Sequence, residues 1–219
     1  MAGPAPDRSA AEKKPLHAIE RDREENRKRR KGFLQRLQTI PPENLIFLDE
    51  SRVTTQMTRG YARAIGGRRV HEAAPGGHWN NLAILGALSL GGLLATMTIE
   101  EATDGDIFLA YVEQVPGPKL QPGDVVVMDN LSAHKVAGVE ELIQAARAEL
   151  LYLPPNSPDL NPIEKAWARL KQLLRSAKAR TAQALDQAIA ELLPQITLQN
   201  AQAWFRHSGI DYISKVKMP

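Results

Sequence analysis

The stretch LYLPPNSPDLNPIEKAW, residues 151–167, joins a short apolar segment to an amphipathic helix. Proline fixes its own φ and restricts the residue before it, so this junction is rigid. The prolines are Pro154, Pro155, Pro158 and Pro162. Apolar residues then recur at helical spacing, which predicts a helix over residues 159–177 with one buried stripe. That stripe consists of Ile163, Trp167, Leu170 and Leu174.

Glu164 lies in the first turn of this helix, and two roles compete for it. With Asn161 as N-cap and Pro162 as the first helical residue, Glu164 stands where a capping box places its carboxylate. Alternatively, Glu164 is a functional carboxylate. It lies beside the apolar stripe, and Lys171 and Arg175 follow it along the same helix face. The rigid turn would then aim Glu164 back at the ends of the strands.

Two short apolar segments end in acids and read as buried strands. NLIFLDES (residues 44–51) carries Asp49, and GDVVVMDN (residues 123–130) carries Asp129. Sites in α/β sheets form at strand ends, so these carboxylates are expected about one strand spacing apart. They would repel unless a cation lay between them, and a hard divalent ion suits oxygen ligands. The alternatives are a polar strand end for Asp49 and an Asx turn for Asp129.

The remaining patterns predict an α/β fold with a mixed sheet and helices on both faces. Three early strands joined by short turns would pair antiparallel, including a hairpin around Gly91 and Gly92. Later strands alternate with helices and should run parallel. Alternation turns Glu50 away from Asp49. The other expected elements are an exposed helix or linker over residues 16–38, a long loop over 52–78, helices over 103–115, 136–150, 181–192 and 198–207, and a strand over 150–155.

Composition limits the class of protein. The chain has 219 residues and no cysteine, which fits a reducing compartment and excludes disulfides and cysteine sites. Its longest apolar stretch, residues 82–97, contains three glycines and is too short for a membrane span. We therefore expect a cytoplasmic protein without membrane contact. Net charge is +3, but residues 27–31 (RKRRK) and 165–180 are basic blocks. They indicate either a polyanion partner or solvated helix faces.

Three motifs together make the chain resemble the catalytic domain of mariner-superfamily transposases, and within them the bacterial insertion-sequence family usually numbered 630. The motifs are FLDES (residues 47–51), VVVMDNLSAHK (125–135) and LPPNSPDLNPIEKAWARLK (153–171). The resemblance extends over roughly residues 13–209. It implies a ribonuclease-H-like fold with an Asp-Asp-Glu triad at Asp49, Asp129 and Glu164. The 34 residues between Asp129 and Glu164 are typical of that superfamily.

The resemblance also implies a reaction. The three carboxylates would hold two Mg²⁺ ions, with Mn²⁺ able to substitute, for cleavage and transfer of DNA strands at transposon ends. Expected partners are transposon terminal inverted repeats, target DNA and a second copy of the chain. Family members read transposon ends with N-terminal helix-turn-helix modules. The segment before the first strand is too short for two such modules, so a separate helix-turn-helix polypeptide is a further expected partner. When bound to DNA, the protein is expected to be associated with the nucleoid.

Several further residues are candidates for orienting the metal ligands or contacting DNA. They are Asn130, His134, Asn161, Lys165, Arg169 and Lys171. The alternative for Asn130 and His134 is a turn residue and a surface histidine. Within this scheme residues 1–42 form a disordered, basic linker and helix, residues 43–180 the catalytic domain, and residues 181–219 a helical extension packed on it.

Two other functions remain open at this point. One is a catalytically inactive transposase remnant that still binds DNA, and the other is a ribonuclease-H-type nuclease acting on RNA–DNA hybrids. A nucleotide hydrolase is disfavoured because the chain lacks the G-x-x-x-x-G-K-[ST] phosphate-binding loop.

Overall fold

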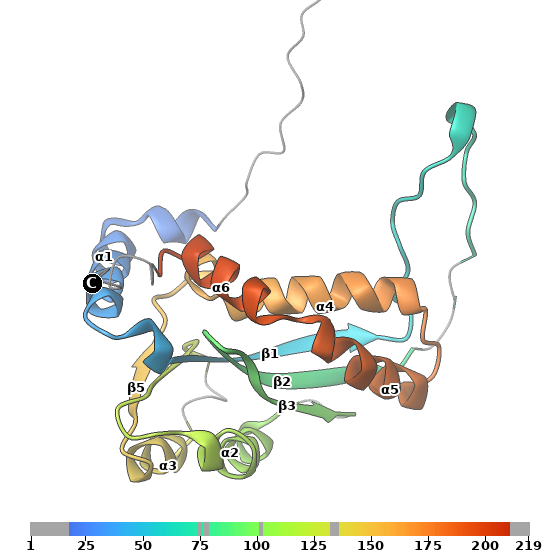
Figure 1. Ribbon diagram of the computed structural model, residues 1–219. Coiled ribbons are helices and arrows are strands. Elements are labelled where there is room, and N and C mark those ends of the chain that lie inside the picture. Colours follow the sequence, from blue (N-terminus) through green and yellow to red (C-terminus); the bar gives the residue numbers. More distant parts are fainter. Residues whose placement is uncertain (1–17, 74–75, 77–78, 101–102, 132–135, 211–219) are drawn as a thin grey trace, which may run out of the picture.

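One mixed five-stranded sheet forms the centre of the molecule. The computed structural model describes residues 18–73, 76, 79–100, 103–131 and 136–210. The strand order is β3-β2-β1-β4-β5 (Figure 1). β1 pairs antiparallel with β2 and parallel with β4, β2 pairs antiparallel with β3, and β4 pairs parallel with β5. The strands are β1 (Leu45–Thr54), β2 (Asn81–Ser89), β3 (Gly92–Ile99), β4 (Val125–Met128) and β5 (Glu149–Tyr152).

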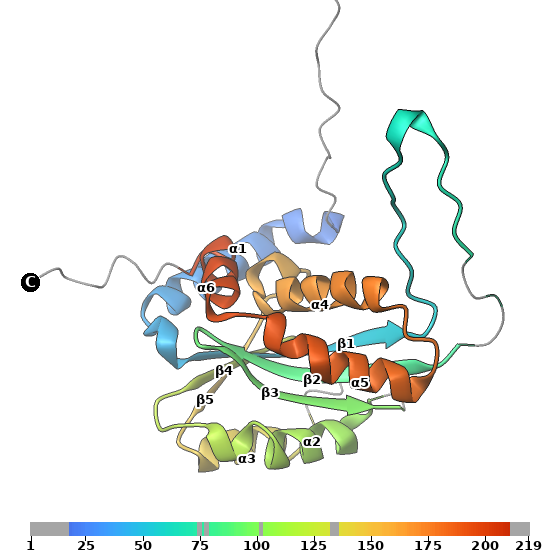
Figure 2. The same cartoon turned by 45° about the vertical axis from the view of Figure 1, so that its right-hand side comes forward.

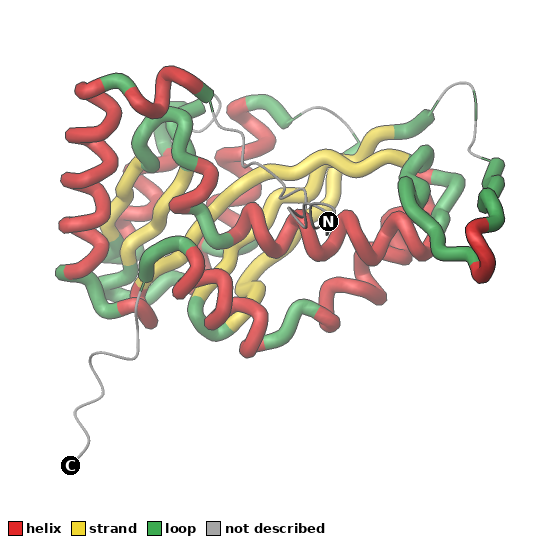
Figure 3. Tube along the Cα trace, turned by 90° about the horizontal axis from the view of Figure 1, so that it is seen from above, coloured by secondary structure: helices red, strands yellow, loops and turns green. Residues whose placement is uncertain are grey.

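Helices cover both faces of the sheet, which confirms the predicted fold class. α4, α5 and α6 lie over one face, while α2 and α3 lie over the other (Figures 1 and 2). Seen from above, helices lie over the strands of the sheet (Figure 3). No helix within the described ranges is long and apolar enough to span a bilayer. The helices are α1 (Glu24–Gln38), α2 (Gly105–Gln114), α3 (Val139–Ala145), α4 (Ile163–Ala177), α5 (Ala182–Leu192) and α6 (Leu198–His207).

The alternation of side chains along the strands assigns residues to the two faces. In β1, Leu45 and Phe47 pack into the core under α4 and α6, whereas Ile46 and Leu48 pack into the core over α2 and α3. Because side chains alternate, Asp49 shares the face of Phe47 and lies on the α4 side. The same alternation applies to β4, where Val125 and Val127 face α4. Asp129, two residues after Val127, therefore lies on the same side.

The N-terminal helix α1 is largely exposed, as expected, but two of its apolar residues dock it on the core. Phe33 and Leu37 are both buried in the cluster that underlies α4. At the other end of the chain, α6 buries Phe205, whose ring meets that of Phe47 edge-on at 5.5 Å between centroids. Both terminal helical segments thus help to cover the face on which Asp49 lies.

The extent of β1 differs from the prediction. We expected the strand to end at its acids, but it continues five residues past Asp49 to Thr54. The reason is that the two neighbours of β1 differ in length, since β4 pairs with it only as far as Phe47 while β2, on its other side, pairs with it as far as Thr54. The long loop expected over residues 52–78 corresponds to the connection between β1 and β2, residues 55–80, so these two strands are not joined by a short turn.

Two helices are shorter than predicted for identifiable backbone reasons. α4 begins at Ile163 because Asn161, which precedes a proline, adopts an extended conformation (φ −105°, ψ 100°). A separate 3₁₀ turn, Pro158–Leu160, comes before it. α3 ends at Ala145, and Arg147 then takes a left-handed conformation (φ 57°), which leads the chain into β5.

Candidate active site

A cleft of about 360 Å³ lies where β1, the end of β4 and the start of α4 meet. Its walls include all three acids predicted from the sequence, Asp49, Asp129 and Glu164. The proline-rich turn before α4 forms most of the remaining surface, so the rigid segment and the acids belong to one site. The other lining residues are Asn130, Leu131, Leu153, Pro154, Pro155, Asn156, Ser157, Pro158 and Asn161.

The strand register brings the two aspartates together. Phe47 of β1 pairs with Val127 of β4, so two residues further along both strands Asp49 comes opposite Asp129. Asp129 directly follows the last residue of β4, and its Oδ1 accepts a hydrogen bond from the Leu131 N–H at 3.2 Å. The Asx turn is therefore formed, and it holds Asp129 at the cleft.

Asp49 is the most perturbed acid of the cleft. It is only 8% exposed. Burial raises the pKa of Asp49 to about 8, and the negative charges of Glu164 and Asp129 add to the rise. The Glu50 N–H, which donates to Asp49 Oδ1 at 2.9 Å, works in the opposite direction. A buried carboxylate beside two others is disfavoured in its charged form unless a cation compensates it.

Glu164 reaches the cleft from the first turn of α4 and does not act as a cap. The helix begins without a side-chain capping hydrogen bond, and the Asn161 N–H donates instead to Pro158 O at 3.1 Å. Glu164 is exposed, but partial burial of its carboxyl raises its pKa. The charge of Lys171 opposes this rise and that of Asp129 adds to it. The capping alternative for Glu164 is thus not supported.

Asn161 connects the start of α4 to β1. Its side chain is buried, and its Nδ2 donates to Asp49 Oδ2 at 3.4 Å. Its Oδ1 is also buried and has no hydrogen-bond partner within the described part of the chain. A buried amide oxygen without a partner is costly, so this atom is available to a ligand that enters the cleft.

Trp167 and Gly86 form a support for Asp49 that our reading of the sequence missed. Gly86 is the β2 residue paired with Asp49, and a Cβ at this position would lie 2.4 Å from the Trp167 ring. The Trp167 indole lowers the Asp49 pKa, although its Nε1 makes no hydrogen bond to any described residue. The signal was a glycine inside the strand pattern of residues 81–90, which indicates a close approach.

Of the other predicted site residues that the structure describes, Asn130 lies at the cleft, whereas the basic residues of α4 lie outside it. Asn130 lines the cleft and is exposed. Lys165 and Arg169 are exposed on α4, Lys171 is half-buried, and none of the three lines the cleft. Arg169 donates to Gln172 Oε1 at 3.0 Å. His134 lies outside the described residues.

The donor set of the cleft suits a hard divalent cation. It offers carboxylate oxygens from three elements and the amide oxygen of Asn161, which are the ligand types that Mg²⁺ and Ca²⁺ prefer. Over the described ranges, no three His, Cys, Asp or Glu side chains already stand close enough to hold a metal. Because the Glu164 side chain is exposed, it is the one of the three carboxylates that can turn inward to complete the group of metal ligands.

Comparison with known proteins extends these observations. Residues 44–186 match a family described as DDE superfamily endonuclease. No curated protein sequence is similar enough to be matched to the chain. Its fold is similar to a solved "Mos1 transposase paired-end complex with left transposon end" (TM-score 0.69, 13% identity), with 90% of this chain and 62% of that chain aligned. It is also similar to the "catalytic domain of Mos1 mariner transposase" (TM-score 0.59, 13% identity), with 88% and 90% aligned.

The chain spans about three fifths of the Mos1 chain in the paired-end complex, and nine tenths of the Mos1 catalytic domain is aligned. At this identity the likeness establishes the fold, which is the expected ribonuclease-H-like one. The family match covers about two thirds of the chain and includes Asp49, Asp129 and Glu164. The chain belongs to the DDE superfamily endonuclease family.

Proposed function

We propose that this chain is the catalytic domain of a DNA transposase that cuts DNA at transposon ends and transfers the strands, with divalent metal ions as cofactors. One observation carries the proposal. Asp49, Asp129 and Glu164 come from three separate elements to one cleft, and the charges of the other two acids raise the pKa of the buried Asp49. Such a cluster is stable in its charged form only with a cation.

Asp49, Asp129 and Glu164 would provide the metal ligands. Asn161 would orient Asp49 through its amide, and the exposed Glu164 carboxylate would turn inward to complete the set. Two Mg²⁺ ions bound there, or Mn²⁺ in their place, would supply an activated water or 3′-hydroxyl nucleophile and stabilise the leaving oxygen of an in-line displacement at phosphorus. The chain itself then has to position acids and DNA, and needs no general base.

The structural relatives support DNA as substrate and a divalent metal as cofactor. They are described as Mos1 complexes with transposon ends, and as paired-end complexes with Mg or Mn. By analogy we propose transposon-end and target DNA as partners, a dimer in the active complex, and a separate helix-turn-helix polypeptide for end recognition. The turn sequence NSPDLNPIE supports placement of the chain in the bacterial insertion-sequence family numbered 630. We propose that the protein acts in the cytoplasm, on the nucleoid.

Exposed basic residues on α4 are proposed to contact DNA phosphates. Lys165 and Arg169 follow Glu164 on the same helix and are exposed. Asn130, beside Asp129 in the cleft, is a candidate for contact with the strand being cut. Phosphate contacts of this kind bind DNA without regard to sequence and weaken as salt rises.

The test is cleavage by the purified full chain. DNA carrying the inverted repeats that flank its gene is incubated with the protein in Mg²⁺ or Mn²⁺, beside an RNA–DNA hybrid of the same sequence. We expect metal-dependent cuts at the DNA ends, and loss of cutting with Asp129→Ala and Glu164→Gln. Glu164→Gln keeps the shape of the side chain, so its effect reports the charge.

Each other outcome points to a different function. Salt-sensitive DNA binding without metal uptake or cutting identifies an inactive remnant. Preferential cutting of the hybrid identifies a ribonuclease. If no DNA is cut and the Asp129→Ala variant behaves like the parent, the proposal is wrong.

A further inference from the structure

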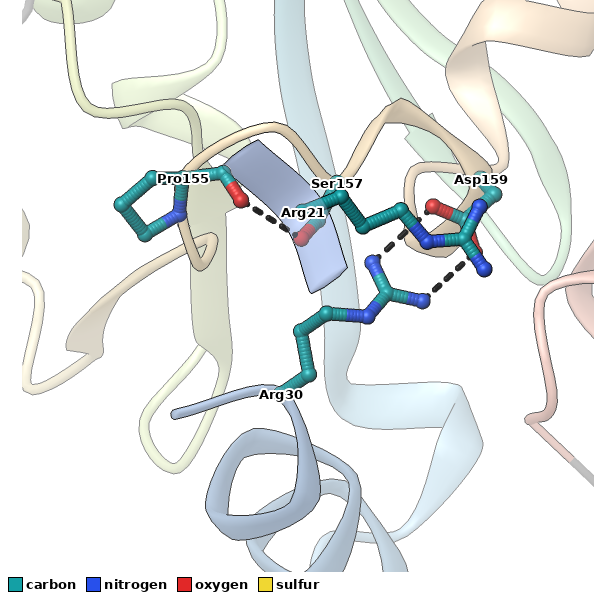
Figure 4. Close-up of polar contacts among 5 residues, drawn as sticks. All are labelled: Arg21, Arg30, Pro155, Ser157 and Asp159. Atoms are coloured by element: carbon teal, nitrogen blue, oxygen red, sulfur yellow. Dashed lines mark hydrogen bonds and ion pairs between the residues drawn. The ribbon is translucent and has the colours of Figure 1, made fainter. Parts of the chain in front are cut away.

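An arginine of α1 clamps the turn that leads into α4. Arg30 donates two parallel hydrogen bonds to Asp159, at 3.0 Å and 2.7 Å, across 129 positions of sequence (Figure 4). Arg21, from the short 3₁₀ turn before α1, adds a second cation at 3.9 Å from Asp159 Oδ2. Paired guanidinium–carboxylate bonds fix orientation as well as distance, so this contact defines where the turn lies relative to α1.

The environment of this ion pair is unlike that of an ordinary surface pair. The Arg30 side chain is only 13% exposed, whereas that of Asp159 is 42% exposed. Burial alone would raise the pKa of Asp159, but the hydrogen bonds and charge of Arg30 outweigh it and the pKa is lowered. Asp159 is therefore held in its charged, bonded form. It does not line the acid-lined cleft, so the pair acts on the outer side of the turn.

The turn connects Asp159 to the cleft through a short series of hydrogen bonds. Ser157 Oγ donates to Pro155 O at 3.0 Å, and the Leu160 N–H to Ser157 O at 3.1 Å. The Asn161 N–H donates to Pro158 O, and the Glu164 N–H to Asn161 O at 3.2 Å. These bonds lie on either side of Asp159 along the turn, so a shift of the turn at Asp159 would move both Asn161 and Glu164.

We propose that the Arg30–Asp159 ion pair is a positioning device for the metal site. Arg30 holds the outer side of the turn, and Asn161, two residues after Asp159, reaches Asp49 from its inner side. The pair sets the place of Asn161 and Glu164 relative to Asp49 without touching any reacting atom. This inference rests on the proposed function, because it assumes that the cleft binds metal.

Several side chains of the basic run at residues 27–31 form ion pairs within the protein. Three of its members are engaged within the protein: Lys28 with Glu24 at 2.8 Å, Arg29 with Glu25, and Arg30 with Asp159. Arg30 thus links the N-terminal helix to the turn before α4, and its guanidinium is engaged within the protein. α1 becomes part of the catalytic unit.

The same helix offers a matched control. Arg36 of α1 pairs with Glu149 at the start of β5, at 2.5 Å, and both side chains are about half exposed. Breaking this pair also removes a contact that docks α1, but one that leads to β5 and not to Asp159. If Arg30 served only to dock α1, Mn²⁺ affinity in both variants would change only as far as the melting temperature does.

The experiment is a calorimetric titration of the full chain with Mn²⁺, with thermal melting as a check on folding. The variants are Arg30→Met, Asp159→Asn and the control Arg36→Met. We expect Arg30→Met and Asp159→Asn each to weaken Mn²⁺ binding by about tenfold, as supporting residues of metal sites do. Arg36→Met should bind Mn²⁺ like the parent. The reversed pair, Arg30→Asp with Asp159→Arg, should recover most of the affinity.

Because Arg30 and Asp159 have opposite charges, their two variants distinguish positioning from a purely electrostatic effect on Mn²⁺ affinity. Removing the cation Arg30 would tighten Mn²⁺ binding through the field, whereas removing the anion Asp159 would weaken it. Positioning predicts weakening in both. The inference is overturned if Arg30→Met matches Arg36→Met, or if the two variants shift affinity in opposite directions. A parent that binds no Mn²⁺ overturns the proposed function as well, whereas equal affinities in parent and variants overturn only the positioning role.

Discussion

Asn161 Nδ2 lies 3.4 Å from Asp49 Oδ2, so the helix that carries Glu164 starts in contact with the central acid of β1. This contact joins residues 112 positions apart and brings together two of the three segments that form the cleft. It also explains why the chain is rigid before α4. Asn161 is held extended by the following Pro162, which aims its amide at Asp49.

Replacing Asn161 by Ala should damage metal binding more than folding. The variant loses the donor to Asp49 and the buried Oδ1, and we expect Mn²⁺ affinity and DNA cleavage to fall by about 10–100-fold. Asn44→Ala is the control, because Asn44 Nδ2 makes a similar bond to Gly123 O at 3.0 Å at the other end of β1. Equal Mn²⁺ affinities in the two variants would show that Asn161 has no special role.

Gly86→Ala should destabilise the protein through Trp167. The added methyl would lie 2.4 Å from one ring atom of Trp167 and 2.8 Å from another. Overpacking of this kind costs about 1–3 kcal/mol in the free energy of unfolding, measured by urea denaturation. Gly91→Ala is the control, since its methyl would come no closer than 3.5 Å to Ser89. Combining Gly86→Ala with Trp167→Phe should recover part of the loss. No loss in Gly86→Ala would contradict the packing described here.

The metal-free protein should lose stability as pH rises from about 4 to about 8. The pKa of Asp49 is about 8 in the fold against 3.8 ordinarily, so over this window the folded state keeps a proton that the unfolded chain releases. The free energy of unfolding then falls with pH, by at most about 1.4 kcal/mol per pH unit. Denaturation in a chelator at several pH values measures this slope.

Asp49→Asn is the control for the pH dependence. It removes the titrating group, so the fall in stability over this window should be largely lost. Mn²⁺ added near pH 8 should stabilise the parent and not the variant, because ligand binding to the folded state shifts the unfolding equilibrium. A slope that persists unchanged in Asp49→Asn would assign the titration to another group.

Arg180 should fix the start of the long connection between β1 and β2. Its Nη1 donates to Thr55 O at 2.9 Å and to Met57 O at 3.0 Å, so this member of the basic block serves the fold. Hydrogen bonds from a charged donor contribute about 1.5 kcal/mol or more. Arg180→Gln should therefore speed amide exchange around residues 55–60 by about tenfold, whereas Arg175→Gln should not. Equal exchange in both variants would contradict this anchoring.

Local pattern in the sequence was sufficient to locate the strands, the main helices and the acids at the ends of these elements. Alternation put Glu50 on the face opposite Asp49, where its carboxylate accepts from Arg52 Nε at 3.2 Å. The helical period identified the buried stripe of α4 through Trp167 and Leu170. These features depend on residues close in sequence, which is why they could be predicted.

The features that were missed depend on which segments meet in space. β1 continues past Asp49 because β2 pairs with it from Ile46 to Thr54, whereas β4 on its other side pairs only as far as Phe47, and no pattern within the strand carries that information. Arg30 belonged to a run of like charges, and only the docking of α1 shows that its partner is Asp159. Gly86 was evident in the sequence, but that it makes room for the Trp167 ring could be seen only once the position of Trp167 was known.

Anomalous diffraction from crystals of the full chain, grown near pH 8 and soaked in Mn²⁺, tests whether the three acids hold a metal. We expect a manganese peak within about 2.1 Å of carboxylate oxygens of Asp49 and Asp129, with Glu164 turned toward it, and no such peak in Asp49→Asn crystals. Manganese bound only elsewhere, or an empty cleft at saturating Mn²⁺, would contradict this expectation.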